Sequence, residues 1–165
     1  HHRHIPECKS INYGKRTDKW VELVFQELKI KAPIEIISVP GRFEKYENFT
    51  LDVAHNKQAI KYLIERDSEY ENIIIGILED KNVKDIIRIL PQRAKLMACN
   101  LPTERGISAE KLNEIARDMG YQCSEYGSVK EAMKDVKKMK TLVTGSFYTV
   151  SDARQHLNLK GHSEL

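Results

Sequence analysis

The chain has 165 residues, of which 41% are hydrophobic and 31% charged, with a formal net charge of +3. This length suffices for one domain with a sizeable core. Basic and acidic residues alternate, as in 81–85, so no basic stripe is available to follow a nucleic-acid backbone. No apolar run approaches the roughly 20 residues of a membrane span, and the N-terminus shows no secretory signal. We therefore expect a globular protein with no nucleic acid and no membrane among its partners.

The three cysteines form no C-x-x-C pair, Cys99 ends an apolar run, and Cys123 lies two residues after Tyr121. We expect them to be reduced, small hydrophobic side chains rather than a disulfide, which favours a cytoplasmic location. Three histidines lie within the first four residues, where a frayed or appended terminus is a better interpretation than a metal site.

The first part of the chain differs in pattern from the rest. Apolar residues at helical spacing predict an amphipathic helix over 17–29. A short β segment is expected over 34–39, ended by Pro40-Gly41.

From residue 49 onward, strands and helices alternate. The expected strands are 49–53, 72–78, 94–99, 121–124 and 141–145. The expected helices are 57–66, 83–90, 108–119, 128–138 and 150–157. This alternation predicts an α/β fold: a Rossmann-like, mostly parallel sheet with helices on both faces. The boundary divides the chain into a tail and linker over 1–39 and one domain over 40–165.

Polar residues follow the predicted strands at the edge where open α/β sheets bind their ligands. They are Asp52, His55 and Asn56 after the first strand, Asp80 and Lys81 after the second, Arg105 after the third and Ser146 after the last, with Arg42 leading into the first. Arginine and lysine suit phosphate or carboxylate groups, and Ser146 can present donors at a helix start. Each residue also has a structural alternative: a cap for Asp52 or Asn56, an ion pair with Glu44 for Arg42, and an exposed turn for Asp80-Lys81.

Several common catalytic signatures are missing from the sequence. It contains no G-x-x-x-x-G-K-[ST] loop, no G-x-G-x-x-G fingerprint, no G-x-S-x-G elbow and no zinc-ligand spacing. The chain therefore carries no self-contained phosphate-binding loop.

Five segments, in order, resemble the C-terminal domain of the folylpolyglutamate synthases, which are relatives of the Mur ligases. They are Pro40-Gly41-Arg42-Phe43-Glu44, Leu51-Asp52-Val53-Ala54-His55-Asn56, Gly76-Ile77-Leu78-Glu79-Asp80-Lys81-Asn82, Pro102-Thr103-Glu104-Arg105 and Thr144-Gly145-Ser146-Phe147-Tyr148. The last four are similar to the family's LDGAHN, G-x-x-x-D-K-D, P-x-x-R and TGSLY motifs. The resemblance spans about residues 40–154.

The resemblance implies an ATP-dependent amide ligase that activates a folate or dihydropteroate carboxylate as an acyl phosphate and joins it to L-glutamate. It places Arg42, Asp52, His55 and Asn56 at the nucleotide, with Arg42 near phosphate and Asp52 near ribose. It places His55, Asp80, Lys81, Arg105 and Ser146 at the incoming glutamate, with His55, Lys81 and Ser146 as catalytic candidates. ATP and Mg²⁺ are the implied cofactors, and glutamate and folate the implied small-molecule substrates.

Two departures from the family pattern bear on this interpretation. Val53 stands where the family usually has glycine, so the loop is expected to differ where backbone approaches a ligand. The family's phosphate-binding loop and Mg²⁺ ligands belong to an N-terminal ATPase domain, of which residues 1–39 would be the tail. We expect that domain to be the partner of this one, and we expect the chain to be inactive alone. A Mur-type ligase domain with another acceptor and a non-catalytic ligand-binding or regulatory module remain the alternatives.

Overall fold

The computed structural model describes residues 39–159. The helix predicted over 17–29 and almost all of the β segment predicted over 34–39 lie outside the described residues.

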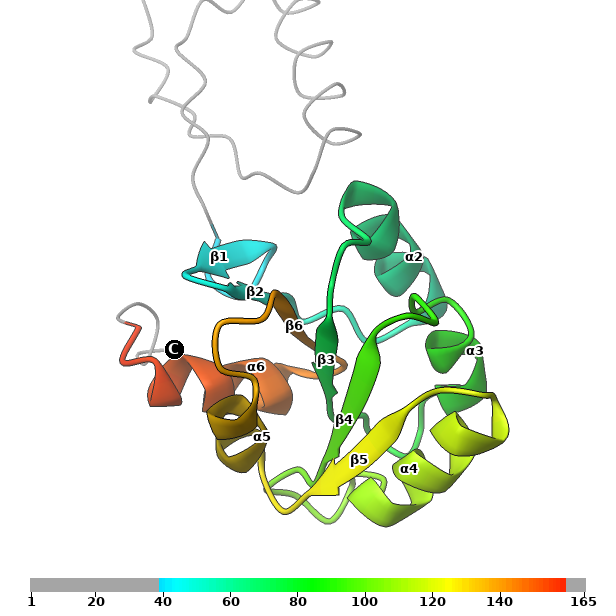
Figure 1. The fold of residues 1–165 in the computed structure, drawn as a ribbon. Helices are drawn as coiled ribbons and strands as arrows, with labels where there is room; N and C mark the ends of the chain where they lie inside the picture. Colours follow the sequence, from blue (N-terminus) through cyan, green and yellow to red (C-terminus); the bar gives the residue numbers. More distant parts are fainter. Residues whose placement is uncertain (1–38, 160–165) are drawn as a thin grey trace, which may run out of the picture.

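The described residues form one six-stranded sheet in the order β1-β2-β6-β3-β4-β5 (Figure 1). The strands are β1 (Glu44–Tyr46), β2 (Phe49–Leu51), β3 (Asn72–Ile75), β4 (Lys95–Cys99), β5 (Cys123–Tyr126) and β6 (Thr141–Thr144). Only the β1–β2 pair is antiparallel, and the other neighbours are parallel. The mostly parallel α/β fold expected from the sequence is confirmed.

Helices cover both faces of this sheet (Figure 1). They are α2 (Lys57–Arg66), α3 (Val83–Ile87), α4 (Ala109–Asp118), α5 (Val129–Asp135) and α6 (Phe147–His156). Side chains of α2, α3 and α4 share one buried cluster with Ile73 and Ile75 of β3. Side chains of α5 and α6 share another with Ile74 of the same strand. Because alternate residues of a strand face opposite ways, the continuous apolar run of β3 is explained by burial on both faces.

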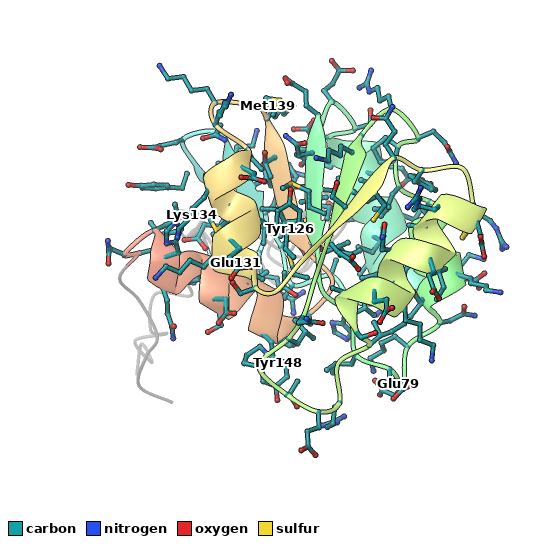
Figure 2. The ribbon with its side chains drawn as sticks, turned by 60° about the horizontal axis from the view of Figure 1, so that its bottom comes forward. Glu79, Tyr126, Glu131, Lys134, Met139 and Tyr148 are labelled. Carbon is teal, nitrogen blue, oxygen red and sulfur yellow. The ribbon has the colours of Figure 1, made fainter. Side chains whose placement is uncertain are left out.

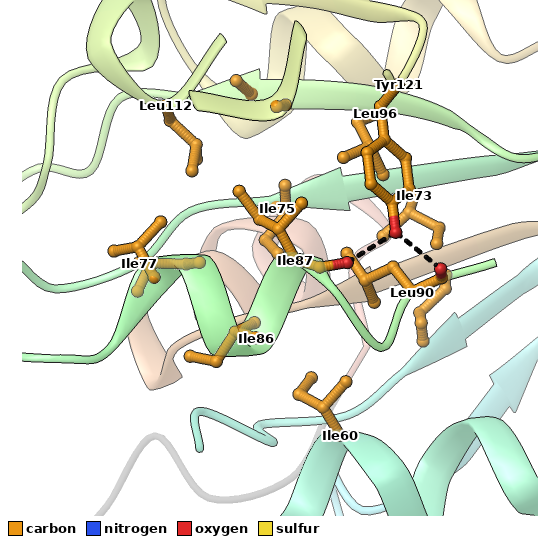
Figure 3. Close-up of a cluster of buried hydrophobic side chains, with 14 of the residues drawn as sticks. Ile60, Ile73, Ile75, Ile77, Ile86, Ile87, Leu90, Leu96, Leu112 and Tyr121 are labelled. Carbon is orange, nitrogen blue, oxygen red and sulfur yellow. Dashed lines mark hydrogen bonds between the residues drawn. The ribbon is translucent and has the colours of Figure 1, made fainter. Parts of the chain in front are cut away.

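The larger cluster contains one polar anchor, Tyr121 (Figure 3). Its hydroxyl lies 2.7 Å from the carbonyl oxygen of Ile87 and 2.8 Å from that of Leu90, at the end of α3. Burial raises the pKa of this phenol, so the hydroxyl stays a donor. Tyr121 thereby ties the segment before β5 to the end of α3.

Several predicted boundaries were wrong, for local reasons. β1 was not expected, and it forms a short hairpin with β2. β3 ends at Ile75 rather than at residue 78, because the following residues pair instead with the loop after β4: the Ile107 amide donates to Ile77, and Leu78 bridges Gly106. β5 starts at Cys123 rather than at 121, because Tyr121 is committed to the core.

Two helix boundaries also differ. α6 begins at Phe147 rather than at 150, because Ser146 is its N-cap. α5 ends at Asp135, before Lys137 takes a positive φ of 50°.

The strand order reverses between β3 and β6. β3 leads to β4 on one side, whereas the chain returns from β5 through α5 to place β6 on the other side of β3. The crevice between the carboxyl ends of β3 and β6 is therefore the usual ligand position of an open α/β sheet.

Candidate functional site

The loops that follow the parallel strands gather on one rim of the molecule. Figure 2 shows Glu79, after β3, and Tyr148, in the first turn of α6, on this rim, while Met139, before β6, lies at the opposite end. The predicted site residues come from the segments of this rim.

The crevice between β3 and β6 is filled by the chain itself. Gly145 has a φ of +105°, and a Cβ there would lie 2.6 Å from the carbonyl oxygen of Gly76. The Thr149 hydroxyl donates to that same oxygen at 2.9 Å. Two glycines thus let the loops after β3 and β6 meet backbone to backbone.

Ser146 belongs to this closed crevice. Its side chain is buried, with 2% of the residue exposed, and its Oγ accepts from the Thr149 amide at 3.0 Å as the cap of α6. Its Oγ also lies 2.7 Å from Thr149 Oγ1. Because the Thr149 proton goes to Gly76, Ser146 must donate in this pair. The hydroxyl of Ser146 is therefore committed to the fold, and its role as a catalytic residue stays a prediction.

Asp52 holds the linker against the loop after β2. One carboxylate oxygen accepts from the Phe43 amide at 2.8 Å and the other from the Ala54 amide at 2.8 Å. Burial raises the pKa of this carboxyl, although both amides and Arg42 act in the opposite direction. Asp52 therefore acts as a local cap, the structural alternative weighed above, and its predicted ribose contact is not tested by these bonds.

The linker is anchored at two further points. Glu44 forms an ion pair with Arg154 of α6, and its Oε2 accepts from the Gly41 amide at 2.7 Å. A Cβ on Gly41, whose φ is +69°, would lie 3.1 Å from Val150 and 3.2 Å from Val53. Glu44 is thus paired with α6, and the segment that carries Arg42 is packed on the domain.

Val53 fits its loop without a glycine-like backbone. The non-glycine residues with positive φ in 39–159 are Phe43, Glu47, Lys137 and Asn158. Val53 is not one of them, and its side chain is buried against Gly41. The valine adds packing between the loop and the linker.

Arg42 and His55 both lie near one exposed aromatic ring, that of Phe147. The Arg42 guanidinium carbon lies 6.0 Å from the ring centroid, and the His55 ring lies 6.0 Å away, tilted by 41°. His55 Nδ1 is 2.9 Å from the Val53 carbonyl oxygen. A carbonyl only accepts, so His55 Nδ1 donates in this bond, which leaves Nε2 as an acceptor whenever the ring carries a single proton.

Asn56 forms the first cap of the next helix. Its Oδ1 accepts from the Ala59 amide at 2.9 Å, which confirms the capping expected from the sequence. Lys57, which follows it, lies 3.8 Å from Asp85 of α3, so the starts of α2 and α3 are neighbours. The predicted contact of Asn56 with a nucleotide is not tested.

The structure brings Asp80, Lys81 and Arg105 together. Lys81 Nζ lies 3.0 Å from an Asp80 oxygen, and this bond, with a further contribution from Arg105, lowers the pKa of the Asp80 carboxyl. The Glu79 amide donates to the Arg105 carbonyl at 2.8 Å, which fastens the loop after β3 to the loop after β4. The three side chains form an exposed charged group with two cations and one anion.

Sequence reasoning missed a small hollow and the ring of Phe147. The hollow, of about 90 Å³, lies between the linker and α2. It is lined by Arg42, Phe43, Asp52, Ala59, Tyr62, Leu63 and Arg66. The pattern Ser146-x-x-Thr149 is a signal that could have placed the start of α6, and hence Phe147, on the rim.

Two further findings concern membranes and metals. None of the helices in 39–159 is long and apolar enough to cross a membrane. Within the same range, no three His, Cys, Asp or Glu side chains gather closely enough to hold a metal ion.

Curated relatives confirm the resemblance seen in the motifs. The chain is 31% identical over 139 residues to a dihydrofolate synthase/folylpolyglutamate synthase of Buchnera aphidicola subsp. Schizaphis graminum, covering 75% of this chain and 32% of the relative. It is 29% identical over 128 residues to a probable bifunctional folylpolyglutamate synthase/dihydropteroate synthase of Haloferax volcanii, covering 70% and 15%. The chain thus spans about a third or less of these relatives, and it matches their C-terminal portion. No family model matches the chain.

Solved structures with the same fold as this chain include two enzymes of this kind. A bifunctional folylpolyglutamate synthase/dihydrofolate synthase of Yersinia pestis, complexed with AMPPNP and Mn ion, superposes with a TM-score of 0.75 at 25% identity, covering 96% of this chain and 42% of that one. A folylpolyglutamate synthase of Thermotoga maritima gives a TM-score of 0.74 at 23% identity, covering 88% and 39%.

Proposed function

We propose that this chain is the C-terminal domain of an ATP-dependent glutamate ligase of the folylpolyglutamate synthase and dihydrofolate synthase family, whose C-terminal portion it matches in sequence and fold. The domain comprises residues 40–165, and residues 1–39 are the end of an ATPase domain with its linker. The whole enzyme works in the cytoplasm on a folate or dihydropteroate acceptor.

One observation carries this proposal: the Arg42 guanidinium carbon and the His55 ring each lie 6.0 Å from the ring of Phe147 on the rim. A guanidinium binds phosphate oxygens through paired hydrogen bonds. An imidazole with its Nδ1 proton already committed offers Nε2 to a second group. This pair suits a reaction in which a phosphate and an amine meet.

In the reaction, an oxygen of the acceptor carboxylate bonds to the γ-phosphorus of ATP, and ADP leaves. The nitrogen of glutamate then bonds to the acyl carbon, the bond from that carbon to the phosphate oxygen breaks, and phosphate departs with the electron pair. The ammonium of glutamate must first lose a proton. We assign this proton to His55 Nε2, and the second proton, which the nitrogen loses after it bonds to the acyl carbon, leaves with the departing phosphate.

The other rim residues position substrates. Arg42 holds phosphate oxygens, and Asp52 fixes the linker while facing the ribose. Lys81 and Arg105 provide cations for the carboxylates of glutamate, with Asp80 setting the position of Lys81 at 3.0 Å. Asn56 starts α2 beside the nucleotide, and Ser146 holds α6 in place.

Mg²⁺ is assigned no ligand within residues 39–159, which offer no cluster suited to it. ATP and the metal are held chiefly by the ATPase domain. The Yersinia pestis relative, complexed with AMPPNP and Mn ion, supports this use of nucleotide and divalent metal. The domain is therefore one half of a shared site.

The test is ligation by the full-length protein encoded by the reading frame that contains this chain. With ATP, Mg²⁺, L-glutamate and a dihydropteroate or folate acceptor, we expect amide formation measured by mass spectrometry. Arg42→Ala should lower kcat/KM by about 100-fold or more, the scale of losing a charge-stabilising contact. Arg88→Ala, on the exposed side of α3, is the matched control and should change it little. Full activity of Arg42→Ala, or no amide with the wild-type protein, would contradict the proposal.

A further inference from the structure

Phe147 is the most exposed of the large hydrophobic side chains in 39–159. It is 61% exposed, whereas Tyr46, Tyr62, Met139 and Tyr148 are between 37% and 39% exposed. An exposed phenyl ring forgoes most of the stabilisation that burial of a side chain of this size provides. The fold gains little from a large ring at this position.

The start of α6 does not depend on this ring. Ser146 Oγ caps the helix, and Thr149, Val150 and Ala153 form its buried face. The phenyl ring belongs to neither of the two buried clusters. Local folding therefore does not explain an aromatic residue here.

The surroundings of the ring do suggest a role. The guanidinium carbon of Arg42 and the ring of His55 each lie 6.0 Å from its centroid. In the function proposed above, these two residues meet the phosphate and the incoming amine, so the ring lies beside the acyl carbon. An apolar surface beside a reactive carbonyl keeps water from it.

We propose that Phe147 shields the acyl phosphate from water, so that the amine rather than water reaches the acyl carbon. In the productive step, the nitrogen of glutamate forms the new bond and phosphate leaves. In the wasteful step, the oxygen of water forms that bond, phosphate leaves with the electron pair, and the acceptor carboxylate is regenerated. Both steps release one phosphate, but only the first forms an amide. This inference rests on the proposed ligase function.

The experiment measures phosphate released per amide formed by the full-length protein with ATP, Mg²⁺, glutamate and acceptor. The wild-type protein should give a ratio near one. Phe147→Ala should raise the ratio about threefold or more, because water gains access. Phe147→Leu retains an apolar side chain and should stay near the wild-type ratio.

Tyr148→Ala is the matched control, because it removes the neighbouring exposed aromatic ring of the same helix turn. Its ratio should remain near one. Circular dichroism of each variant should match the wild-type spectrum, since the helix is capped independently of Phe147.

Two results would overturn the inference. If the wild-type protein forms amide and Phe147→Ala lowers the rate while the ratio stays near one, the ring assists closure or binding but does not exclude water. If the wild-type protein forms no amide at all, the proposed function fails and this inference fails with it.

Discussion

Two neighbouring regions of the rim use similar residues in opposite ways. In the crevice between β3 and β6, Ser146 and Thr149 are buried, and their hydrogen bonds are made within the chain. Phe147, the residue that directly follows Ser146, is exposed, and Arg42 and His55 both lie near its ring. Polar residues that follow a strand can therefore either stabilise the fold or remain available to a ligand. The exposed fraction of each side chain and the number of its hydrogen-bond partners within the chain distinguish the two cases. Substitutions in each region test this division.

The largest effect is expected for Gly145→Ala. The substitution places a Cβ 2.6 Å from the Gly76 carbonyl oxygen and imposes a strained φ of +105°. We expect a loss of about 3 kcal/mol or more in the free energy of unfolding, measured by urea denaturation. Gly120→Ala is the control: its φ is +85°, but its nearest neighbour is 4.0 Å away, so only about 1–2 kcal/mol should be lost. Equal losses would show that the crevice is not tightly closed.

Thr149→Val should come next. Valine keeps the shape of threonine but removes the hydroxyl that donates to the Gly76 carbonyl and accepts from the Ser146 hydroxyl, whereas the amide at 149 still donates to Ser146. Burial of these groups without their hydroxyl partner should cost about 2 kcal/mol in the same denaturation experiment. Thr103→Val, in an exposed turn, should cost less than about 0.5 kcal/mol. A loss as small for Thr149→Val would contradict the chain of hydrogen bonds from Ser146 through Thr149 to Gly76.

Ser146→Ala and His55→Ala compare a buried residue that caps a helix with a partly exposed residue of the rim. Ser146→Ala removes the N-cap of α6 and should cost about 1 kcal/mol of stability. His55→Ala removes one partly exposed hydrogen bond and should change stability by about 0.5 kcal/mol or less. Thermal unfolding of both variants checks this order, and the reverse order would show that His55 holds the loop.

The smallest expected effect is on the loss of folding stability at acid pH, and it involves Asp67. Burial is the largest single influence on Asp67 and opposes its ionisation, but the hydrogen bond from Lys140, at 2.7 Å, together with the Glu69 amide and the charges of Lys140 and Lys45, lowers the pKa of this carboxyl. A lowered pKa stabilises the fold above the unfolded value near 3.8, and this contribution is lost as the pH falls through the folded pKa. Asp67→Asn should therefore flatten the loss of stability in acid, followed by denaturation at several pH values.

Asp52 should behave in the opposite sense. Burial raises its pKa, so its ionisation costs stability as the pH rises from 3.8 through the folded value. Asp52→Asn should remove this cost while losing one of the two amide bonds.

A steeper acid loss in Asp67→Asn than in the wild-type protein would contradict the stabilising role of the ionised Asp67 carboxylate.

The sequence predicted the elements of the sheet well, because the β3 run and the helical spacing of 57–66 report burial directly. It misplaced the ends of β3 and β5, since these depend on contacts with distant segments: the loop after β4 for Ile77, and α3 for Tyr121. Such contacts between distant segments produce no pattern in the local sequence from which the strand ends could be predicted.

The candidate site was predicted in part. Position after a strand placed His55 and Asp80 at the same edge of the sheet, and the roles given to them and to Arg42 stay predictions. They did not reveal that Ser146 is buried or that Phe147 is exposed, because both outcomes depend on how closely Gly76 and Gly145 approach. That approach is a property of the packed fold.

The most direct test of the proposed ligase site is a crystal structure of the full-length protein with a non-hydrolysable ATP analogue, Mg²⁺ and L-glutamate. We expect the Arg42 guanidinium within hydrogen-bond distance, about 3 Å, of a phosphate oxygen, with His55 Nε2 facing the glutamate amine. We also expect the Thr149 bond to the Gly76 carbonyl to be unchanged. Ligands seated in an opened crevice between β3 and β6, with Arg42 and His55 turned to solvent, would contradict the proposed site.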